Sequence, residues 1–130
     1  MAPLSRHQTP DAKVKRKQAE KAGRRAEWLC TVWLRLKGYR ILECRHQSRL
    51  GEIDIIAKRG KMMAAIEVKN RARLDDALLA IRPQQQQRIA RALHAYAAKT
   101  GHDGDLRLDL MAVGQFGRIW HFENAWQAKS

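Results

Sequence analysis

Acidic residues and a lysine recur at alternate positions in the stretch Gly51–Arg71. Glu52 and Asp54 are separated by one apolar residue, and so are Glu67 and Lys69. Because side chains alternate between the two faces of a strand, each pair shares a face if the stretch forms strands. Carboxylates held together on one face repel each other unless a cation lies between them. The spacing therefore favours a site for a divalent cation.

This stretch is predicted to form a β-hairpin with Arg59–Gly60 as a two-residue turn. The resulting register puts Glu52 opposite Glu67. It puts Asp54 opposite Ala65, so that Glu67 is the diagonal neighbour of Asp54. Diagonal neighbours lie roughly 7–8 Å apart at the backbone, within reach of a shared ion. A slip by one residue would place Asp54 and Glu67 on opposite faces of the sheet.

Oxygen ligands on a shallow surface suit Mg²⁺ or Mn²⁺ better than zinc. Cys30 and Cys44 are too few and too far apart in the sequence for a zinc site or a disulfide framework, and they fit reduced cytoplasmic thiols. The alternative is a solvated polar face on which Lys69 only pairs with Glu67. An acidic residue on the preceding strand, in the right parity, favours the metal site.

The order D-x(n)-E-x-K on adjacent strands resembles the active site of the PD-(D/E)xK nuclease superfamily. The longer segments G-E-I-D-I-I-A and E-V-K-x-R resemble the YraN family of uncharacterised bacterial proteins, which is regarded as distantly related to archaeal Holliday junction resolvases. The resemblance runs from about Gly23 to about Trp126. It implies a restriction-endonuclease-like core and a metal-dependent endonuclease acting on DNA, with branched or otherwise structured DNA as a candidate substrate.

The resemblance also implies roles for individual residues. Asp54, Glu67 and the backbone carbonyl of Val68 would bind Mg²⁺ or Mn²⁺. Lys69 would orient or activate the attacking water and offset charge in the transition state. Related resolvases carry a first-helix glutamate near the metal, and Glu27 in G-x-x-x-E-x-L matches that segment. The alternative for Glu27 is an exposed helix acid.

Family members usually have a Lys-Gln pair at the start of the second helix. Alignment on Pro83 and Arg88–Ile89 makes Gln86 the matching glutamine, which could contact substrate or orient water. Gln85 replaces the lysine, and this departure removes a charge that would contact phosphate. A plain helix surface is the alternative for these glutamines.

The chain has 130 residues, with 26 Lys and Arg against 13 acidic residues and a formal net charge of +13. Such an excess favours a polyanionic partner, nucleic acid above all, and the resemblance implies DNA in preference to RNA. The rival hypothesis is a non-catalytic nucleic-acid-binding protein that retains the nuclease scaffold. An RNA-processing or ribosome-associated factor and a homodimer are both left open. The sequence has no secretory signal and no apolar stretch of 18 residues, which predicts a cytoplasmic protein without a membrane partner.

The fold class expected is α/β, a restriction-endonuclease-like three-layer sandwich with a mixed central sheet, in the order α-β-β-β-α-β-β. Residues 1–20 are interpreted as a flexible basic N-terminal arm and residues 21–130 as a single nuclease-like domain. Arg107 and Asp109, which resemble the family's R-x-D, are expected to form a structural pair or a rim contact. Trp120 and Trp126 are expected in the core. The predicted segments are a helix over 23–36, a strand over 39–44, a polar loop over 45–49, a helix from 83, strands over 106–111 and 118–122, and a helical cap over 123–126.

Overall fold

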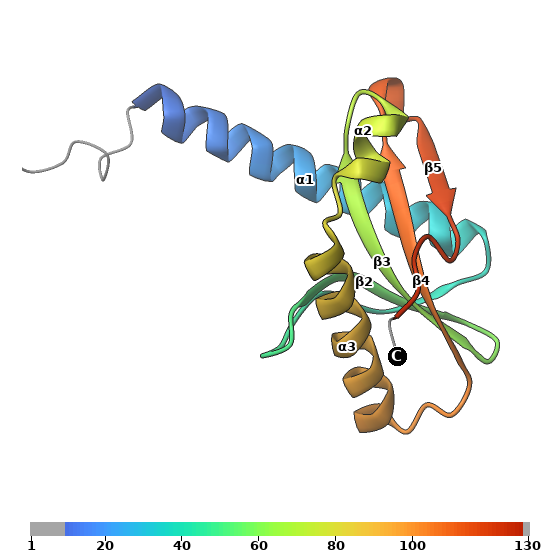
Figure 1. Cartoon of the computed structure of the whole chain (residues 1–130). Coiled ribbons are helices and arrows are strands. Elements are labelled where there is room, and N and C mark those ends of the chain that lie inside the picture. Colours follow the sequence, from blue (N-terminus) through green and yellow to red (C-terminus); the bar gives the residue numbers. More distant parts are fainter. Residues whose placement is uncertain (1–9, 129–130) are drawn as a thin grey trace, which may run out of the picture.

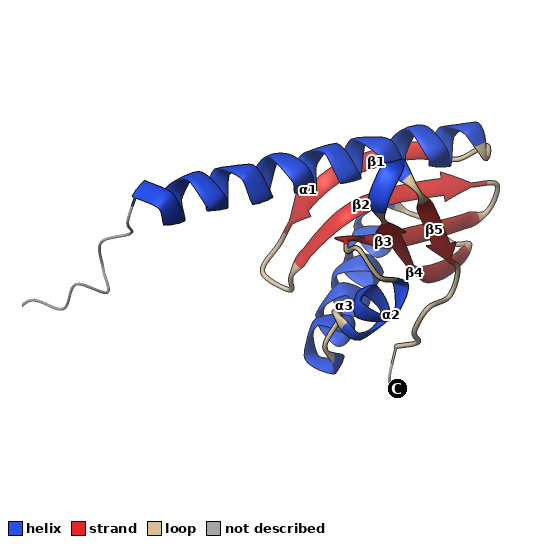
Figure 2. Ribbon diagram, turned by 90° about the horizontal axis from the view of Figure 1, so that it is seen from above, coloured by secondary structure: helices blue, strands red, loops and turns tan. Residues whose placement is uncertain are grey.

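A five-stranded sheet with helices on both faces forms the protein (Figure 1). The computed structural model describes residues 10–128. Seen from above, α1 lies on one face of the sheet, and α2 and α3 lie on the other (Figure 2). The elements in chain order are α1 (Pro10–Leu36), β1 (Arg40–Gln47), β2 (Glu52–Arg59), β3 (Met62–Asn70), α2 (Leu74–Leu79), α3 (Pro83–Thr100), β4 (Asp105–Val113), the 3₁₀ turn η2 (Gln115–Gly117) and β5 (Ile119–Phe122).

The sheet is mixed, and its strand order follows the chain. β1, β2 and β3 pair antiparallel through short turns, and β5 pairs antiparallel with β4. β3 and β4 pair parallel, because the chain between them crosses over through α2 and α3. The predicted α/β sandwich with a mixed central sheet is confirmed, and its architecture is restriction-endonuclease-like. The short helix α2 was not predicted.

Two apolar clusters hold the three layers together, one on each face of the sheet. Alternation along β2, β3 and β4 sends successive side chains to opposite faces. One cluster packs α3 on the sheet and includes Ile56, Ala65, Ile89, Leu93, Leu110 and Trp126. The other packs α1 on the sheet and includes Ala26, Cys30, Leu34, Ile55, Ile66 and Met111. Trp126 is buried, as expected, and Trp120 is half-buried.

The hairpin register differs from the predicted one by two residues. Arg59 pairs with Met62, so Gly60 and Lys61 form the two-residue turn. Gly60 has a φ of 61°, and a two-residue turn favours glycine at its first central position for this reason. A shift by two keeps the parity of the paired residues, so Glu67 and Lys69 keep the face predicted for them.

Two predicted segments, the loop after β1 and the helical cap after β5, differ from the structure. The predicted loop over 45–49 is wrong at its start, because β1 continues to Gln47, which pairs with Glu52 of β2. Pairing with a neighbouring strand thus outweighs the polar character of these residues. The predicted helical cap over 123–126 is also wrong, because β5 is followed only by a turn.

α1 is longer than predicted, and it packs on the sheet through the face that carries Cys30 and Leu34. The arm predicted over residues 1–20 is wrong from residue 10 onward, because α1 begins at Pro10, which fits the first turn of a helix. Residues 1–9 lie outside the described residues. Cys30 and Leu34 are buried, whereas Trp33 and Leu36 are exposed. Within residues 10–128, no helix is long and apolar enough to span a membrane.

Candidate functional site

The candidate site lies where β2 and β3 part. The ladder between the two strands ends at the pair Ile55 and Ile66. Beyond that pair, the backbone N–H of Val68 donates to Oδ2 of Asp54 at 2.8 Å. The Asp54 carboxylate therefore takes the place of a strand carbonyl at the open end of the hairpin. It lies beside the strand segment that carries Glu67 and Lys69.

Glu67 and Lys69 point to the same face of β3, as their spacing predicts. The Lys69 Nζ lies 3.5 Å from Oε1 of Glu67. The Glu67 side chain is 7% exposed and the Lys69 side chain 16%, so both groups are largely removed from water. Asp54, Glu67 and Lys69, the predicted central residues, are thus brought together.

Burial raises the pKa of Glu67 to about 8. The charge of Asp54 and a hydrogen bond between the two carboxyl groups act in the same direction, and Lys69 opposes them. A buried carboxylate next to a second carboxylate is disfavoured for both reasons. Near neutral pH, the pair therefore favours one proton or a cation between its oxygens.

Glu27 reaches the same end of the sheet from α1, where it is paired with a cation. Arg45 of β1 donates from Nε to Oε2 of Glu27 at 2.9 Å. Arg45 has a φ of 53°, a left-handed conformation that is uncommon for a residue other than glycine. The charges of Glu52 and Asp54 also act on Arg45. Arg45 therefore binds Glu27 of the first helix and is also under the influence of the Asp54 charge. The sequence did not predict this connection.

Cys30, on the core side of α1, lies close enough to Asp54 and Glu27 for their charges to affect its pKa. Burial raises its pKa to about 12, and the charges of Asp54 and Glu27 add to that rise. The thiol is thus a buried neutral group beneath the acidic residues. It supplies no nucleophile to the site.

Gln85, and not Gln86 as predicted, is the glutamine of α3 that lies near Glu67. Gln85 places its Nε2 3.5 Å from Oε1 of Glu67, so it is the glutamine that faces the acidic pair. The side-chain amide of Gln86 donates to the backbone carbonyl of Ile81. The backbone carbonyl of Gln86 accepts a hydrogen bond from Nε1 of Trp126. The structure does not bring the Gln86 side chain to the other predicted residues.

A basic rim adjoins the site beside α3. Arg82 and Arg88 line a cavity of about 310 Å³ together with Gly51, Glu52, Gln84, Gln85 and Ile89. Both arginines are exposed, and within residues 10–128 neither forms an ion pair with an acidic side chain. A Cβ at Gly51 would lie 3.2 Å from Cβ of Arg88, so the absence of a side chain lets the turn after β1 pack against α3.

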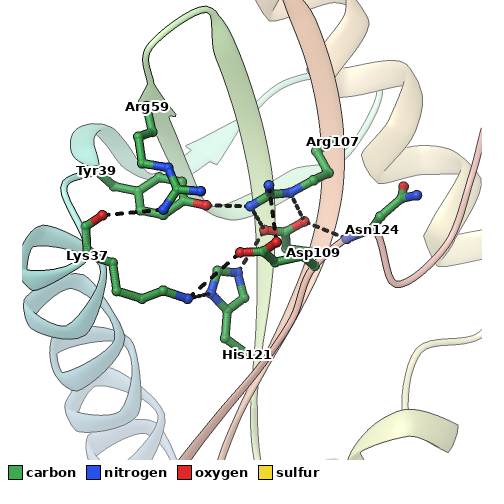
Figure 3. Close-up of polar contacts among 8 residues, drawn as sticks. Lys37, Tyr39, Arg59, Arg107, Asp109, His121 and Asn124 are labelled. Atoms are coloured by element: carbon green, nitrogen blue, oxygen red, sulfur yellow. Dashed lines mark hydrogen bonds and ion pairs between the residues drawn. The ribbon is translucent and has the colours of Figure 1, made fainter.

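Arg107 and Asp109 form a separate buried network on the α1 face of the sheet (Figure 3). Arg107 donates to both carboxylate oxygens of Asp109 at 2.8 Å. Asp109 also lies 2.8 Å from Nε2 of His121 and accepts from the backbone N–H of Asn124 at 2.9 Å. Lys37 contacts Nδ1 of His121 at 2.8 Å. These contacts tie β4 to β5 and to the end of α1, and they support the structural interpretation of the R-x-D segment.

The oxygen donors of the site suit Mg²⁺ or Mn²⁺ with two protein carboxylates. Within residues 10–128, no group of three His, Cys, Asp or Glu side chains converges to hold a metal. Magnesium usually binds through one or two carboxylates and completes its shell with water and substrate phosphate. Asp54 and Glu67 fit that requirement, because the burial of Glu67 and its closeness to Asp54 disfavour two uncompensated negative charges.

Fold and site together define a mixed α/β protein of restriction-endonuclease-like architecture, with an acidic pair and a lysine at the open end of its central hairpin. Comparison with known proteins places this arrangement in a family. Residues 26–113 match the family described as Uncharacterised protein family UPF0102. The chain belongs to UPF0102, which is the YraN family, so the predicted resemblance to that family is confirmed.

Curated relatives cover nearly the same length of chain. A UPF0102 protein of Caulobacter vibrioides is 46% identical over 110 residues, which span 83% of this chain and 88% of the relative. A UPF0102 protein of Maricaulis maris is 44% identical over 113 residues, 85% of this chain and 89% of the relative. A UPF0102 protein of Erythrobacter litoralis is 45% identical over 120 residues, 88% of this chain and 99% of the relative.

Proposed function

We propose that this protein is a metal-dependent endonuclease that hydrolyses phosphodiester bonds in DNA, with branched or otherwise structured DNA as its substrate class. The observation that carries the proposal is the joint placement of Asp54, Glu67 and Lys69. The carboxyl groups of Asp54 and Glu67 interact, burial raises the pKa of Glu67 to about 8, and the Lys69 ammonium group lies 3.5 Å from Glu67. A divalent cation relieves that repulsion, and a phosphodiester bond is a substrate for which cation and lysine together are suited.

The proposed roles follow from the contacts. Asp54 and Glu67 would hold Mg²⁺ or Mn²⁺, with the backbone carbonyl of Val68 as a further oxygen donor. The ion would lower the pKa of a bound water and screen the charge of the phosphate. Lys69 is held against Glu67, where its ammonium can orient a water and offset charge that develops on the phosphate oxygens. Gln85 can hold the Glu67 carboxylate in place through its amide.

A non-catalytic nucleic-acid-binding protein is the second candidate. The observation in its favour is that Arg45 neutralises Glu27 at 2.9 Å, so a third carboxylate is engaged by a cation of the protein itself. In such a protein, Asp54 would serve mainly as the acceptor for Val68 at the open end of the hairpin. Cleavage separates the two candidates.

The test is cleavage of linear, flapped, four-way and single-stranded DNA, and of matched RNA, with Mg²⁺, Mn²⁺ or EDTA. The wild-type protein should cleave, and the Glu67→Gln and Lys69→Ala variants should each fail to cleave. The circular dichroism spectra of both variants should match that of the wild type. Both variants should still bind nucleic acid, because most contacts come from other cations. The endonuclease hypothesis fails if wild type cuts no substrate, or if the Lys69→Ala variant cuts as fast as wild type. Either result would favour the non-catalytic nucleic-acid-binding protein.

Metal binding can be tested apart from cleavage through proton release. Because the pKa of Glu67 is raised to about 8, its carboxyl carries a proton at pH 7 that a metal must displace. Titration of Mn²⁺ into wild type, in buffers of different ionisation enthalpy, should show release of about one proton per ion at pH 7 and less at pH 9. Glu67→Gln should release none and bind more weakly. Proton release that is equal in both proteins would place the ion elsewhere.

A further inference from the structure

The N-terminal part of α1 extends away from the domain. Figures 1 and 2 show it projecting past the end of the sheet, beyond the turn between β1 and β2. Every residue from 10 to 21 is exposed, and packing on the sheet begins at Ala26. The segment 10–25 also precedes the part of the chain that matches the family, which starts at residue 26. The hydrophobic core does not account for this extension.

Cations line one face of the extension. Lys13, Lys17, Lys21 and Arg24 follow each other at helical spacing, and we name these four residues the basic stripe. Within residues 10–128, none of the four forms an ion pair with an acidic side chain. Like charges four residues apart destabilise a helix, and a solvent-exposed helical segment is marginal by itself. A bound polyanion would remove both costs.

The basic stripe lies on the side of α1 that leads to the candidate site. Ala26, Cys30 and Leu34 face the sheet. With about 3.6 residues per turn, the stripe is rotated by roughly 130° from that buried face. Glu27 falls between the two directions on the helix surface, and its carboxylate is paired with Arg45, on which the charge of Asp54 also acts. A ligand that extends along α1 from the stripe would therefore approach Arg45 and Asp54.

We propose that the basic stripe binds the phosphate backbone of a nucleic-acid duplex that enters the candidate site. The inference rests on the proposed function in treating that duplex as the substrate. The stripe covers about 16 Å of helix length, because each residue adds about 1.5 Å. That length corresponds to roughly five base pairs of a duplex, which carries one charge per about 1.7 Å. A straight row of cations matches the regular phosphates of a duplex.

Other polyanions fit the extension less well. A helix that binds a membrane surface needs a continuous apolar face. In residues 10–21, Val14 is the one large apolar side chain, so no such face exists. Proteins that bind single strands place several aromatic side chains along a groove. The extension and its continuation carry one exposed aromatic in line with the stripe, Trp28, which is 62% exposed.

The experiment compares a stripe variant with a matched control. The stripe variant replaces Lys13, Lys17, Lys21 and Arg24 by glutamine. The control variant replaces the same number of lysines and arginines by glutamine at the other end of the β1–β2–β3 ladder and at the end of α3: Arg40, Lys58, Lys61 and Lys99. Binding of a 30-base-pair DNA duplex is measured between 50 and 200 mM salt in EDTA, which prevents cleavage.

Counterion release gives the expected result. Loss of four phosphate contacts should lower the slope of log K against log salt by about 3, and the control should change it by less than about 1. Amide hydrogen exchange over residues 10–21 should slow when wild type binds the duplex and stay fast in the stripe variant. An equal slope change in stripe variant and control, or an unchanged slope in the stripe variant, would overturn the proposal.

The substrate arms and the active-site variant separate this inference from the proposed function. Duplex DNA and duplex RNA share the phosphate chemistry, and a stripe-dependent slope with either supports the inference and identifies the source. Stripe-dependent binding that is tighter to single-stranded DNA or to anionic lipid vesicles contradicts it. If no protein cleaves but Glu67→Gln and wild type both show the stripe-dependent slope, the endonuclease fails and the inference stands. If wild type cleaves and the stripe variant binds with the wild-type slope, the inference fails alone.

Discussion

Glu67 is held where its own charge is disfavoured. Burial raises its pKa to about 8 from an ordinary value of 4.5. Between those two pH values, the unfolded chain has lost the proton that the folded protein keeps. The contribution of Glu67 to stability is therefore fully present below pH 4.5 and is lost as pH rises toward 8. In the metal-free protein, this carboxyl opposes folding under mildly alkaline conditions.

Glu67→Gln should accordingly stabilise the metal-free protein at pH 9. The amide is nearly isosteric and carries no charge, so the pH-dependent loss disappears. We expect a gain in the free energy of unfolding of several kcal/mol, up to about 5, at pH 9 relative to wild type, and about 1 kcal/mol or less at pH 5. Urea denaturation at both pH values in EDTA measures it. Asp103→Asn, at an exposed loop acid, is the control, and a gain of the same size at pH 5 would contradict the argument.

Gln85 offers a second prediction at this scale. It lies 3.5 Å from Glu67 at the position where the family resemblance expects lysine. Gln85→Lys should lower the pKa of Glu67, because an added cation favours the ionised carboxylate. Titration of the Glu67 side-chain carboxyl by NMR measures the change. Gln84→Lys adds the same charge one residue away, and an equal shift in that variant would argue for a general charge effect.

Side-chain parity explains which site residues the sequence could predict. Alternation places Glu67 with Lys69 whatever the register, and a register error of two preserves their face. Gln86 was misassigned because it lies in line with Ala90, Leu93 and Ala97, directly over the core. Its amide is therefore used by the carbonyl of Ile81. Gln85 lies on the flank of that stripe, and helical spacing alone could have identified it as the residue that reaches the site.

At the scale of the elements, the network around Asp109 joins β4, β5 and the end of α1. Burial of Asp109 opposes its charge, but hydrogen bonds from His121 and Arg107 lower its pKa below the ordinary value. The carboxylate therefore contributes stability above that value and loses it as pH falls. Its partners surround a side chain with no exposed surface. Removal of its charge should leave Arg107 largely uncompensated.

Asp109→Asn should destabilise the protein by about 3–5 kcal/mol at pH 7, because it breaks a buried ion pair on one side. Guanidinium denaturation measures the loss. Glu123→Gln is the matched control: its carboxylate lies 3.6 Å from Arg107 but is 45% exposed, so less than about 1 kcal/mol is expected. If the two variants were equally destabilised, the buried network would not be the feature that holds β5 to the sheet.

Elements that depend on long-range pairing or on unpacked helix were the ones the sequence placed poorly. β1 runs through polar residues as far as Gln47 because β2 supplies its partners. α1 extends to Pro10 without an apolar stripe, so helical periodicity predicts only the part of the helix that packs on the sheet. The parallel pairing of β3 with β4 was predictable, because a helix between two strands requires a crossover.

At the scale of the whole molecule, charge and chemistry occupy different parts of the fold. Cations are spread over the surface and are frequent on the extension of α1, whereas Glu67 is buried, beside the half-buried Asp54, at the open end of the hairpin. In the proposed enzyme, surface cations would contact the phosphate backbone in the ground state and in the transition state alike. Such uniform binding changes KM and leaves kcat unaltered.

Salt should therefore act on substrate binding and leave the chemical step alone. On a branched DNA substrate with saturating Mg²⁺, raising salt from 50 to 200 mM should increase KM by tenfold or more, as roughly 3–6 released counterions require. The value of kcat should stay within about a factor of 2, because Lys69 and Glu67 are largely shielded from solvent and buried pairs are screened weakly. Steady-state kinetics at four salt concentrations, with magnesium in constant excess, measure both quantities. A kcat that falls in parallel with binding would mean that surface cations also act on the transition state, and the separation of binding from catalysis would be wrong.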